Sequence, residues 1–283
     1  MDPFKCQTLN APRKSQGDSI GSWAPISGFP RGRAAHQTIS SRRNGRRNVL
    51  IHELKTVFVH VPKAAGQSVE MFFLNGLGET WQTRSRFLLR KNRDLSRGPE
   101  RLAHLFAREY VEFGYIAQHD YESYFKFAIV RNPWARIVSE YCFRGHARSF
   151  TFRDFLTRHL PAPSMSDQYR HIVPQCDFLF DGNGRKIVDY VGRFENINED
   201  FKPVCDRLGL KFDKLPHVNA EGNARRSQEF GEQAGARFAS KSVQQRHAHY
   251  SMYFDDFTRD LVAQLYRKDI EQFGYSFEDV RPT

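Results

Sequence analysis

Two stretches of this chain change from a continuous apolar run to an apolar pattern of helical spacing across a short turn. In the first, residues 56–61 are β-branched or aromatic except for His60, which predicts a buried strand, and apolar positions return at helical spacing over residues 69–73. In the second, residues 124–130 predict a strand with a dense apolar centre, and residues 134–142 repeat apolar side chains at helical spacing. The sequence therefore predicts two strand–turn–helix units, which are typical of α/β proteins.

The first turn holds Pro62, one cation and mostly small residues. Pro62 ends the strand because it lacks a backbone donor. A strand, a tight turn and a helix direct backbone N–H groups and the positive helix end towards an anion. Gly66 allows a phosphate to approach closely, Lys63 supplies a charge and Ser68 a hydroxyl. The turn is not a Walker A loop, in which the lysine comes late. The alternative interpretation is an ordinary turn with a lysine on the surface.

The second turn joins a strand that ends at Arg131 to a helix. Asn132 is a suitable N-cap and Pro133 a suitable first helical residue. Ser139 lies seven residues after Asn132, about two turns on and on the same helix face. An arginine at a strand end and a hydroxyl on the adjoining helix can grip a phosphate, and ligands of parallel sheets bind at such carboxyl ends. The alternative is that Arg131 pairs with a carboxylate and Ser139 only packs.

Charge is unevenly distributed along the 283 residues. Residues 1–55 contain ten basic and three acidic side chains, a net charge of +7 out of +11 for the whole chain. Residues 1–50 also lack apolar periodicity, which predicts a disordered basic tail followed by one domain over residues 51–283. The tail either contacts nucleic acid or anionic lipid, resembles a transit peptide, or has no specific partner. The mildly basic remainder suits a site for a small anion.

Cysteine spacing and hydropathy limit the class of protein further. The four cysteines form no CxxC motif, which argues against a zinc site and favours reduced, buried thiols. No apolar run approaches the ~18 residues of a membrane span, and the N-terminus lacks the apolar core of a secretory signal. We therefore expect a soluble protein of a reducing compartment, the cytoplasm, with at most peripheral membrane contact.

The two turns together carry a resemblance to a known family. Residues 59–68, VHVPKAAGQS, resemble the 5′-phosphosulfate loop of sulfotransferases that use 3′-phosphoadenylyl sulfate (PAPS), and residues 127–139, FAIVRNPWARIVS, resemble their 3′-phosphate motif. The similarity points to the carbohydrate branch that includes heparan sulfate 2-O-sulfotransferase and soluble bacterial relatives. It continues over residues 189–196, 215–219 and 269–275, and so covers about residues 55–278. The chain departs from the family pattern at Gln67, where a small hydroxyl residue is usual.

The resemblance implies a three-layer α/β domain with a mostly parallel central sheet, the P-loop nucleotide-kinase-like sulfotransferase fold. It also implies transfer of a sulfuryl group from PAPS to an acceptor hydroxyl, on a carbohydrate, with adenosine 3′,5′-bisphosphate (PAP) as product. Lys63 would contact the bridging oxygen, and Arg131 and Ser139 would hold the 3′-phosphate. The 5′-phosphate would be held by backbone N–H groups of Ala64, Ala65, Gly66, Gln67 and Ser68. No metal is required, because these cations neutralise the charge.

The acceptor hydroxyl needs a general base, and histidine suits this role. The resemblance places a histidine at the start of the helix before the 3′-phosphate strand, and His104 matches it, at the beginning of a helix predicted over residues 102–113. His119, next to Asp120, is the alternative base. Either histidine could instead be a hydrogen-bonded structural residue.

Two other functions are compatible with the chain. One is a nucleotide-dependent phosphotransferase, against which the missing Walker A loop argues. The other is a nucleic-acid-binding protein that uses the basic tail, although we expect no specific nucleic-acid partner. The arginines of residues 84–101 either meet an acidic acceptor or are solvated. The sequence does not identify the acceptor.

Overall fold

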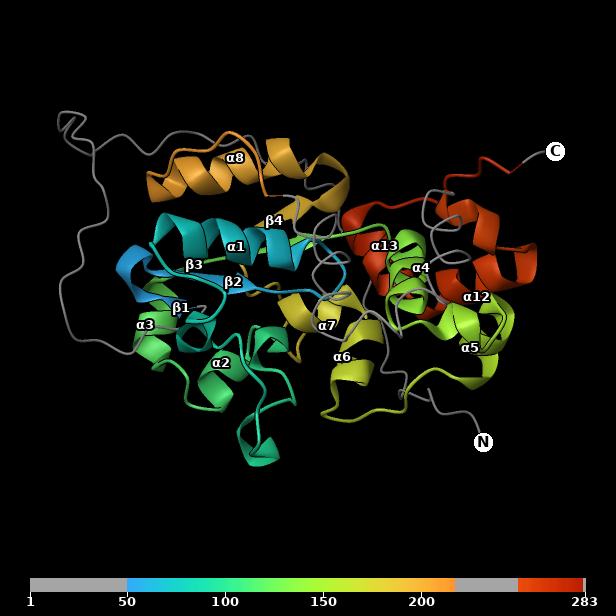
Figure 1. Ribbon diagram of the computed structural model, residues 1–283, viewed down its shortest axis with the longest axis horizontal. Helices are drawn as coiled ribbons and strands as arrows, with labels where there is room; N and C mark the ends of the chain where they lie inside the picture. Colours follow the sequence, from blue (N-terminus) through green and yellow to red (C-terminus); the bar gives the residue numbers. More distant parts are fainter. Residues whose placement is uncertain (1–49, 217–248, 282–283) are drawn as a thin grey trace, which may run out of the picture. The chain divides into compact units, whose positions relative to one another are not determined.

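The computed structural model describes residues 50–216 and 249–281 (Figure 1). The predicted tail of residues 1–50 therefore lies outside the described residues except for Leu50, which begins a strand. Residues 217–219 of the third similar segment also lie outside them. Among the described residues, no helix is both long and apolar enough to cross a membrane.

One four-stranded sheet organises the described residues, with the order β1-β2-β3-β4. Its strands are β1 (Leu50–Ile51), β2 (Thr56–Val59), β3 (Phe125–Val130) and β4 (Tyr190–Arg193). Strands β2, β3 and β4 are mutually parallel, and only β1 runs antiparallel to its neighbour. Every residue of β2 and β3 is buried, which explains why both read as continuous apolar runs rather than alternating ones.

Helices cover both faces of the sheet, as the three-layer prediction requires. Figure 1 shows α1 (Gly66–Gly76) and α8 (Ile197–Leu208) on one side of the strands and α2 (Glu109–Glu112) and α3 (Gln118–Ser123) on the other. The predicted mostly parallel α/β fold is thus confirmed.

Aromatic side chains join these layers. Phe58 of β2 and Phe127 of β3 are register partners whose rings stack with centroids 5.0 Å apart. Phe73 of α1 packs on Phe127 from one side. From the other side, the hydroxyl of Tyr110 donates a hydrogen bond to the Phe58 carbonyl.

A second apolar cluster lies around α4 (Pro133–Phe143), away from the strands. It combines α4 with α5 (Phe152–Arg158) and α12 (Asp256–Leu265), and α13 (Arg267–Phe273) follows directly in the chain. The apolar spacing of residues 254–266 predicts a last helix packed on the sheet. The helix exists, but its apolar side covers α4 and α5 instead, because the sheet faces are already occupied.

The predicted helix over residues 102–113 is wrong. The segment forms a 3-10 turn, η4 (Leu102–His104), an extended residue at Leu105, and the one-turn helix α2. Tertiary contacts override the apolar spacing here, because the Ala107 N–H donates to the Phe178 carbonyl of α7 (Gln175–Leu179) rather than to its own segment. The remaining helices of the described residues are η1 (His52–Leu54), η2 (Arg84–Phe87), η3 (Leu95–Arg97), η5 (His146–Arg148), α6 (Asp167–Ile172), η6 (Phe194–Asn196) and η7 (Tyr250–Tyr253).

Candidate active site

The turn between β2 and α1 has an unusual backbone. The angle φ is +68° at Lys63 and +62° at Ala65, and it is not positive at Ala64 between them. Left-handed conformations of non-glycine residues cost about 1–3 kcal/mol each and concentrate at functional sites. Turns of alternating backbone hand form concavities of N–H groups that bind anions. This loop therefore has the backbone geometry of an anion site.

The N–H groups of this loop are available to a ligand. No N–H group of residues 63–65 makes a hydrogen bond of good geometry to another described residue, and Gly66 and Gln67 open α1, where the N–H groups have no intrahelical acceptor. The Ser68 N–H is used, since it donates to the Ala65 carbonyl at 2.9 Å, so only the half-buried Ser68 hydroxyl remains from that residue. Gln67 is exposed. These free donors stand at the N-terminus of the eleven-residue helix α1, whose dipole also favours negative charge.

Gly66 is required for a reason that the sequence did not indicate. Its φ is not positive, but a Cβ atom added there would lie 1.9 Å from Nε2 of His60. The His60 ring thus lies directly beneath the loop, and its Nδ1 is 2.6 Å from Oε1 of Glu70. The absence of a side chain at Gly66 lets the loop rest on this buried imidazole.

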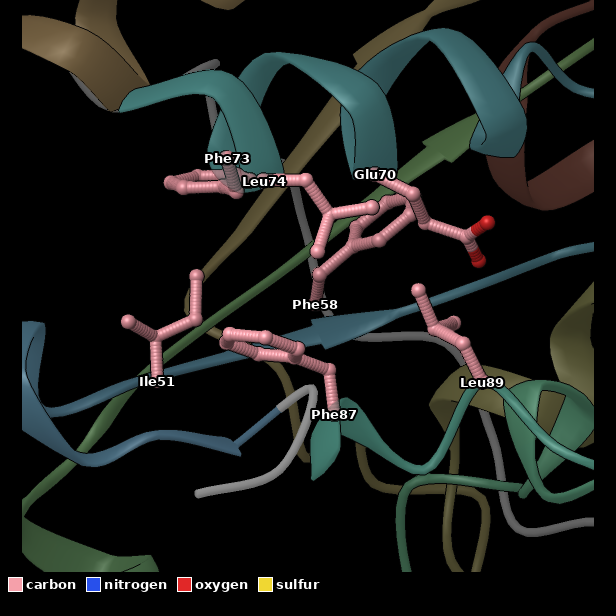
Figure 2. A pocket seen from close by; sticks show the side chains of 7 residues that line it. All are labelled: Ile51, Phe58, Glu70, Phe73, Leu74, Phe87 and Leu89. Atoms are coloured by element: carbon pink, nitrogen blue, oxygen red, sulfur yellow. The ribbon is translucent and has the colours of Figure 1, made fainter. Parts of the chain in front are cut away.

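Glu70 also borders a small cavity of about 20 Å³ between β2 and α1, lined otherwise by apolar side chains. Figure 2 shows its carboxylate directed away from Phe73, Leu74 and Ile51, which is consistent with the bond to His60. A cavity of this size with a single polar neighbour is neither a ligand site nor a good water site. It belongs to the core.

Lys63 carries an ammonium group without a carboxylate partner among the described residues. Its Nζ lies 3.6 Å from the ring centroid of Phe143, a cation–π contact. Burial lowers the pKa of Lys63 from 10.5 to about 8, with Glu140 opposing the shift and Arg131 adding to it. Lys63 is therefore still mainly protonated at neutral pH. A partly desolvated, unpaired cation favours binding of an anion.

Arg131 lies beside the loop. Its Nη1 donates to the main-chain oxygen of Lys63 at 3.2 Å, and its guanidinium lies 4.2 Å from the ring centroid of Phe194. Its Nε is buried and has no hydrogen-bond partner within the described part of the chain. No carboxylate of residues 50–216 or 249–281 forms an ion pair with Arg131. Burial lowers its pKa, and Glu195 opposes this.

Side chains from distant segments fix the backbone of Arg131. Gln175 accepts a hydrogen bond from the Arg131 N–H and donates one to its carbonyl, both at 2.8 Å. The carboxylate of Asp269 in turn accepts from the N–H groups of Gln175 and Cys176. Glu195 accepts from the N–H of Asn132 at 2.7 Å. Two of the segments that carried the family resemblance therefore support the end of β3.

Helix α4 begins as the sequence predicts. The Asn132 side chain accepts from the N–H groups of Trp134 and Ala135, and Pro133 is the first helical residue. Ser139 is half-buried, and its hydroxyl makes no hydrogen bond to a described residue. It stands one turn before Phe143 and so shares the helix face that carries the ring next to Lys63.

His104 is buried close to the loop. Its Nδ1 is 2.8 Å from Oδ1 of Asp167, and its ring makes edge contacts with those of His60 and His171, both at 4.9 Å between centroids. Burial lowers the pKa of His104 from 6.5 to about 3, against the effect of the Asp167 hydrogen bond. The imidazole is therefore neutral at neutral pH, the state that a general base needs.

The structure does not bring His119 to this site. Its side chain is 94% exposed, in α3, which comes before the amino end of β3. Lys63 and Arg131 follow the carboxyl ends of β2 and β3, which are parallel and therefore end at the same edge. His119 lies at the opposite edge of the sheet.

The described residues contain one cluster of possible metal ligands, and its surroundings do not favour metal binding. His104, Asp167 and His171 offer atoms within 4.8 Å of one another. However, Oδ2 of Asp167 accepts from Nη2 of Arg144 at 2.9 Å and lies 3.3 Å from Nε of Arg101. These two guanidinium groups already neutralise the carboxylate and would repel a cation.

The basic loop of residues 84–101 lines an open cavity of about 390 Å³. Its walls contain four basic side chains, one acidic side chain and two neutral ones. The lining residues are Arg90, Lys91, Asn92, Arg93, Asp94, Arg97 and Tyr115. Lys91 pairs with Arg101 through a β-bridge, and Arg101 contacts Asp167. The cavity is thus connected through two residues to the buried pair of Asp167 and His104.

Sequence reasoning missed Asp167, Phe143 and Gln175. Asp167 is 63 residues from His104, and Gln175 is 44 residues from Arg131. Neither belongs to a recognisable local pattern, so no signal in the sequence alone would have paired them. Phe143 lies just beyond residues 127–139, and in the sequence it is one more apolar residue of a predicted helix. Nothing in the sequence indicates its contact with Lys63.

Comparisons with known proteins identify the family of this chain. The profile of the Sulfotransferase family matches residues 48–276. An uncharacterized protein of Archaeoglobus fulgidus is 29% identical over 116 residues, which cover 38% of this chain and 87% of that protein. No solved structure matches the chain. Because the family profile spans most of the chain, this protein belongs to the Sulfotransferase family.

Proposed function

We propose that this protein transfers a sulfuryl group from PAPS to a hydroxyl group of a carbohydrate. Membership of the family supports sulfuryl transfer in general, and the donor and the acceptor are the proposal. The observation that carries it is the contact between Arg131 and the Lys63 carbonyl, 3.2 Å long, which unites the two predicted phosphate-binding turns. We assign this activity to a domain over residues 51–283.

The residues of the loop fit a donor with two phosphate-bearing ends. The backbone N–H groups of residues 63–67, which make no well-formed hydrogen bond outside α1 within the described part of the chain, and the ammonium of Lys63 suit a 5′-phosphosulfate. Arg131, with its unused buried Nε, and the Ser139 hydroxyl suit a 3′-phosphate. When bound, PAPS would supply the sulfuryl group and a phosphate leaving group.

Two side chains would handle the proton and the negative charge that sulfuryl transfer releases. As the bond from the acceptor oxygen to sulfur forms, Nε2 of His104 would take the acceptor proton. As the bond from sulfur to the bridging oxygen breaks, that oxygen keeps the electron pair. Lys63, which is partly desolvated, would stabilise the negative charge on that oxygen. No step requires a metal.

The basic cavity suggests the acceptor. Four basic side chains against one acidic side chain favour a carbohydrate that carries carboxylate or sulfate groups. One wall residue, Lys91, bridges to Arg101, which contacts the Asp167 carboxylate beside the proposed base His104.

A thermal-shift measurement with PAP, AMP and ATP with magnesium tests the donor. At about 100 times Kd, a ligand stabilises the folded state by about 2.7 kcal/mol. We expect strong stabilisation by PAP alone, and Arg131→Ala should remove most of it. Arg153→Ala, which alters an exposed arginine paired with Asp255, is the control and should respond like the wild type. An equal response to all three nucleotides would contradict the 3′-phosphate assignment, and a response to ATP with magnesium alone would favour a phosphotransferase.

A further inference from the structure

The carboxylate of Asp167 is divided between a histidine and two arginines. Oδ1 lies 2.8 Å from Nδ1 of His104. Oδ2 accepts from Nη2 of Arg144 at 2.9 Å and lies 3.3 Å from Nε of Arg101. Asp167 opens α6, and α4 and the end of the basic loop supply the arginines, so three separate segments meet at this carboxylate.

The arrangement decides which nitrogen of His104 carries the proton. Burial opposes ionisation of Asp167, but its hydrogen bonds with His104 and Arg144 hold its pKa well below the usual range. The guanidinium groups of Arg144 and Arg101 can only donate. An ionised carboxylate can only accept. Nδ1 of His104 must therefore be the donor, which leaves Nε2 with the free lone pair.

We infer that Asp167 is a positioning residue for the base: it holds His104 in the tautomer whose Nε2 can accept the acceptor proton. This inference rests on the proposed role of His104 in sulfuryl transfer. It adds to that role a partner that lies 63 residues away in the chain.

Two neighbouring histidines have the same kind of partner. Nδ1 of His60 lies 2.6 Å from Glu70, and Nδ1 of His171 lies 2.6 Å from Glu140. Both rings contact His104 edge-on, and Nε2 of His171 lies 3.6 Å from Oδ1 of Asp167, beyond hydrogen-bond distance. His104 therefore has one strong hydrogen-bond acceptor among these groups, which is Asp167.

The substitution Asp167→Asn tests this arrangement because an amide cannot satisfy both sides. If the NH₂ group of the asparagine faced Arg144 and Arg101, its N–H donors would point at the N–H donors of the two guanidinium groups. The amide oxygen therefore stays with the arginines, and the NH₂ group faces Nδ1 of His104. Nδ1 must then accept, and the ring proton moves to Nε2, which blocks the base. A similar change of tautomer inactivates a serine protease in which the aspartate of the triad is replaced by asparagine.

We expect kcat of Asp167→Asn to fall by about 10²–10⁴-fold, the contribution of a general base, with PAP affinity unchanged. The matched control is Glu109→Gln, which makes the same carboxylate-to-amide change in another buried pair, with Arg170. Glu109→Gln should lower the free energy of unfolding in the same way as Asp167→Asn, but Glu109 contacts none of the proposed site residues. If kcat per folded molecule fell no further in Asp167→Asn than in Glu109→Gln, Asp167 would be structural and the inference would be overturned.

The tautomer itself can be measured without any activity assay. In the full chain labelled with ¹⁵N-histidine, and assigned with His104→Gln, we expect Nε2 of His104 to be unprotonated in the wild type and protonated in Asp167→Asn. Asp167→Glu, which restores a carboxylate, should return the wild-type tautomer. A protonated Nε2 in the wild type would overturn the inference even if Asp167→Asn did not fold. A changed tautomer with unchanged kcat would also overturn it and would remove His104 as the base, while the PAP titration would still test the donor separately.

Discussion

The guanidinium of Arg131 donates through Nη1 to the main-chain oxygen of Lys63, 68 residues earlier in the chain, at 3.2 Å. The carboxyl ends of β2 and β3 meet at one edge of the sheet, so the turns of the two strand–turn–helix units lie side by side. Had the two side chains been on different sides of the sheet, one nucleotide could not have bridged them. The contact also means that Arg131 supports the strained loop, in addition to the phosphate-binding role that we propose for it.

Arg131→Lys should therefore weaken PAP binding although the charge is kept. A lysine cannot contact the Lys63 carbonyl, stack on Phe194 and grip a phosphate in two places at once, because it lacks the planar fork of donors. We expect Kd for PAP, measured by calorimetry, to rise by about 10–100-fold, equivalent to about 1.4–2.8 kcal/mol. Arg153→Lys on the surface should leave Kd unchanged. Unchanged binding by Arg131→Lys would show that charge alone suffices.

Lys63 should make donor binding depend on pH above neutrality. Its pKa is lowered to about 8 by burial, so its charge is present below pH 8 and lost above it. PAP affinity should fall by up to about tenfold per pH unit between pH 8 and 10. Lys63→Arg, which stays charged, should remove this dependence. A wild-type affinity that is constant from pH 7 to 10 would contradict the assignment.

The same residue should lower the stability of the ligand-free protein. The unfolded chain binds the Lys63 proton more tightly, with a pKa of 10.5 against about 8, so the free energy of unfolding should rise as the pH increases from 8 to 10.5. Lys63→Met should raise that free energy at pH 7 by about 1 kcal/mol, because it removes a partly desolvated charge that has no carboxylate partner among the described residues. Urea unfolding with and without PAP measures both effects. A less stable Lys63→Met protein would argue that Phe143 compensates the lysine charge fully.

Gly66→Ala should damage the loop through His60. The added Cβ would lie 1.9 Å from the His60 ring, so the ring or the loop must shift, at about 1–3 kcal/mol of stability. Gly76→Ala at the other end of α1 is the matched control, since a Cβ there meets nothing within 4 Å. Combining Gly66→Ala with His60→Ala should recover part of the PAP affinity. If the double variant binds no better than Gly66→Ala, the glycine has another role.

His104→Ala should lose turnover by about 10²–10⁴-fold and keep PAP binding. His119→Ala should keep both, because its exposed side chain lies at the opposite edge of the sheet. Steady-state rates with PAPS and an acidic oligosaccharide acceptor distinguish the two. Retained turnover in His104→Ala would move the role of base to another residue of the cluster.

Local sequence patterns are sufficient to predict β2 and β3, the N-cap of α4 and the residues of both turns. These are local properties: burial of β2 and β3 produces continuous apolar runs, Pro62 removes a donor, and Asn132 accepts from the two N–H groups that follow it. Such patterns are read within a few residues, and the resemblance to sulfotransferases rests on them.

The rest of the site depends on packing between segments that are distant in the sequence. The apolar spacing of residues 102–113 suggests one helix, but contacts with α7 break it and bury His104 against Asp167. His60 beneath Gly66 and the unpaired Nε of Arg131 likewise depend on packing between elements. The physical reason is that hydrogen bonds between residues tens of positions apart leave no periodic trace in the sequence, whereas strands, caps and turns do.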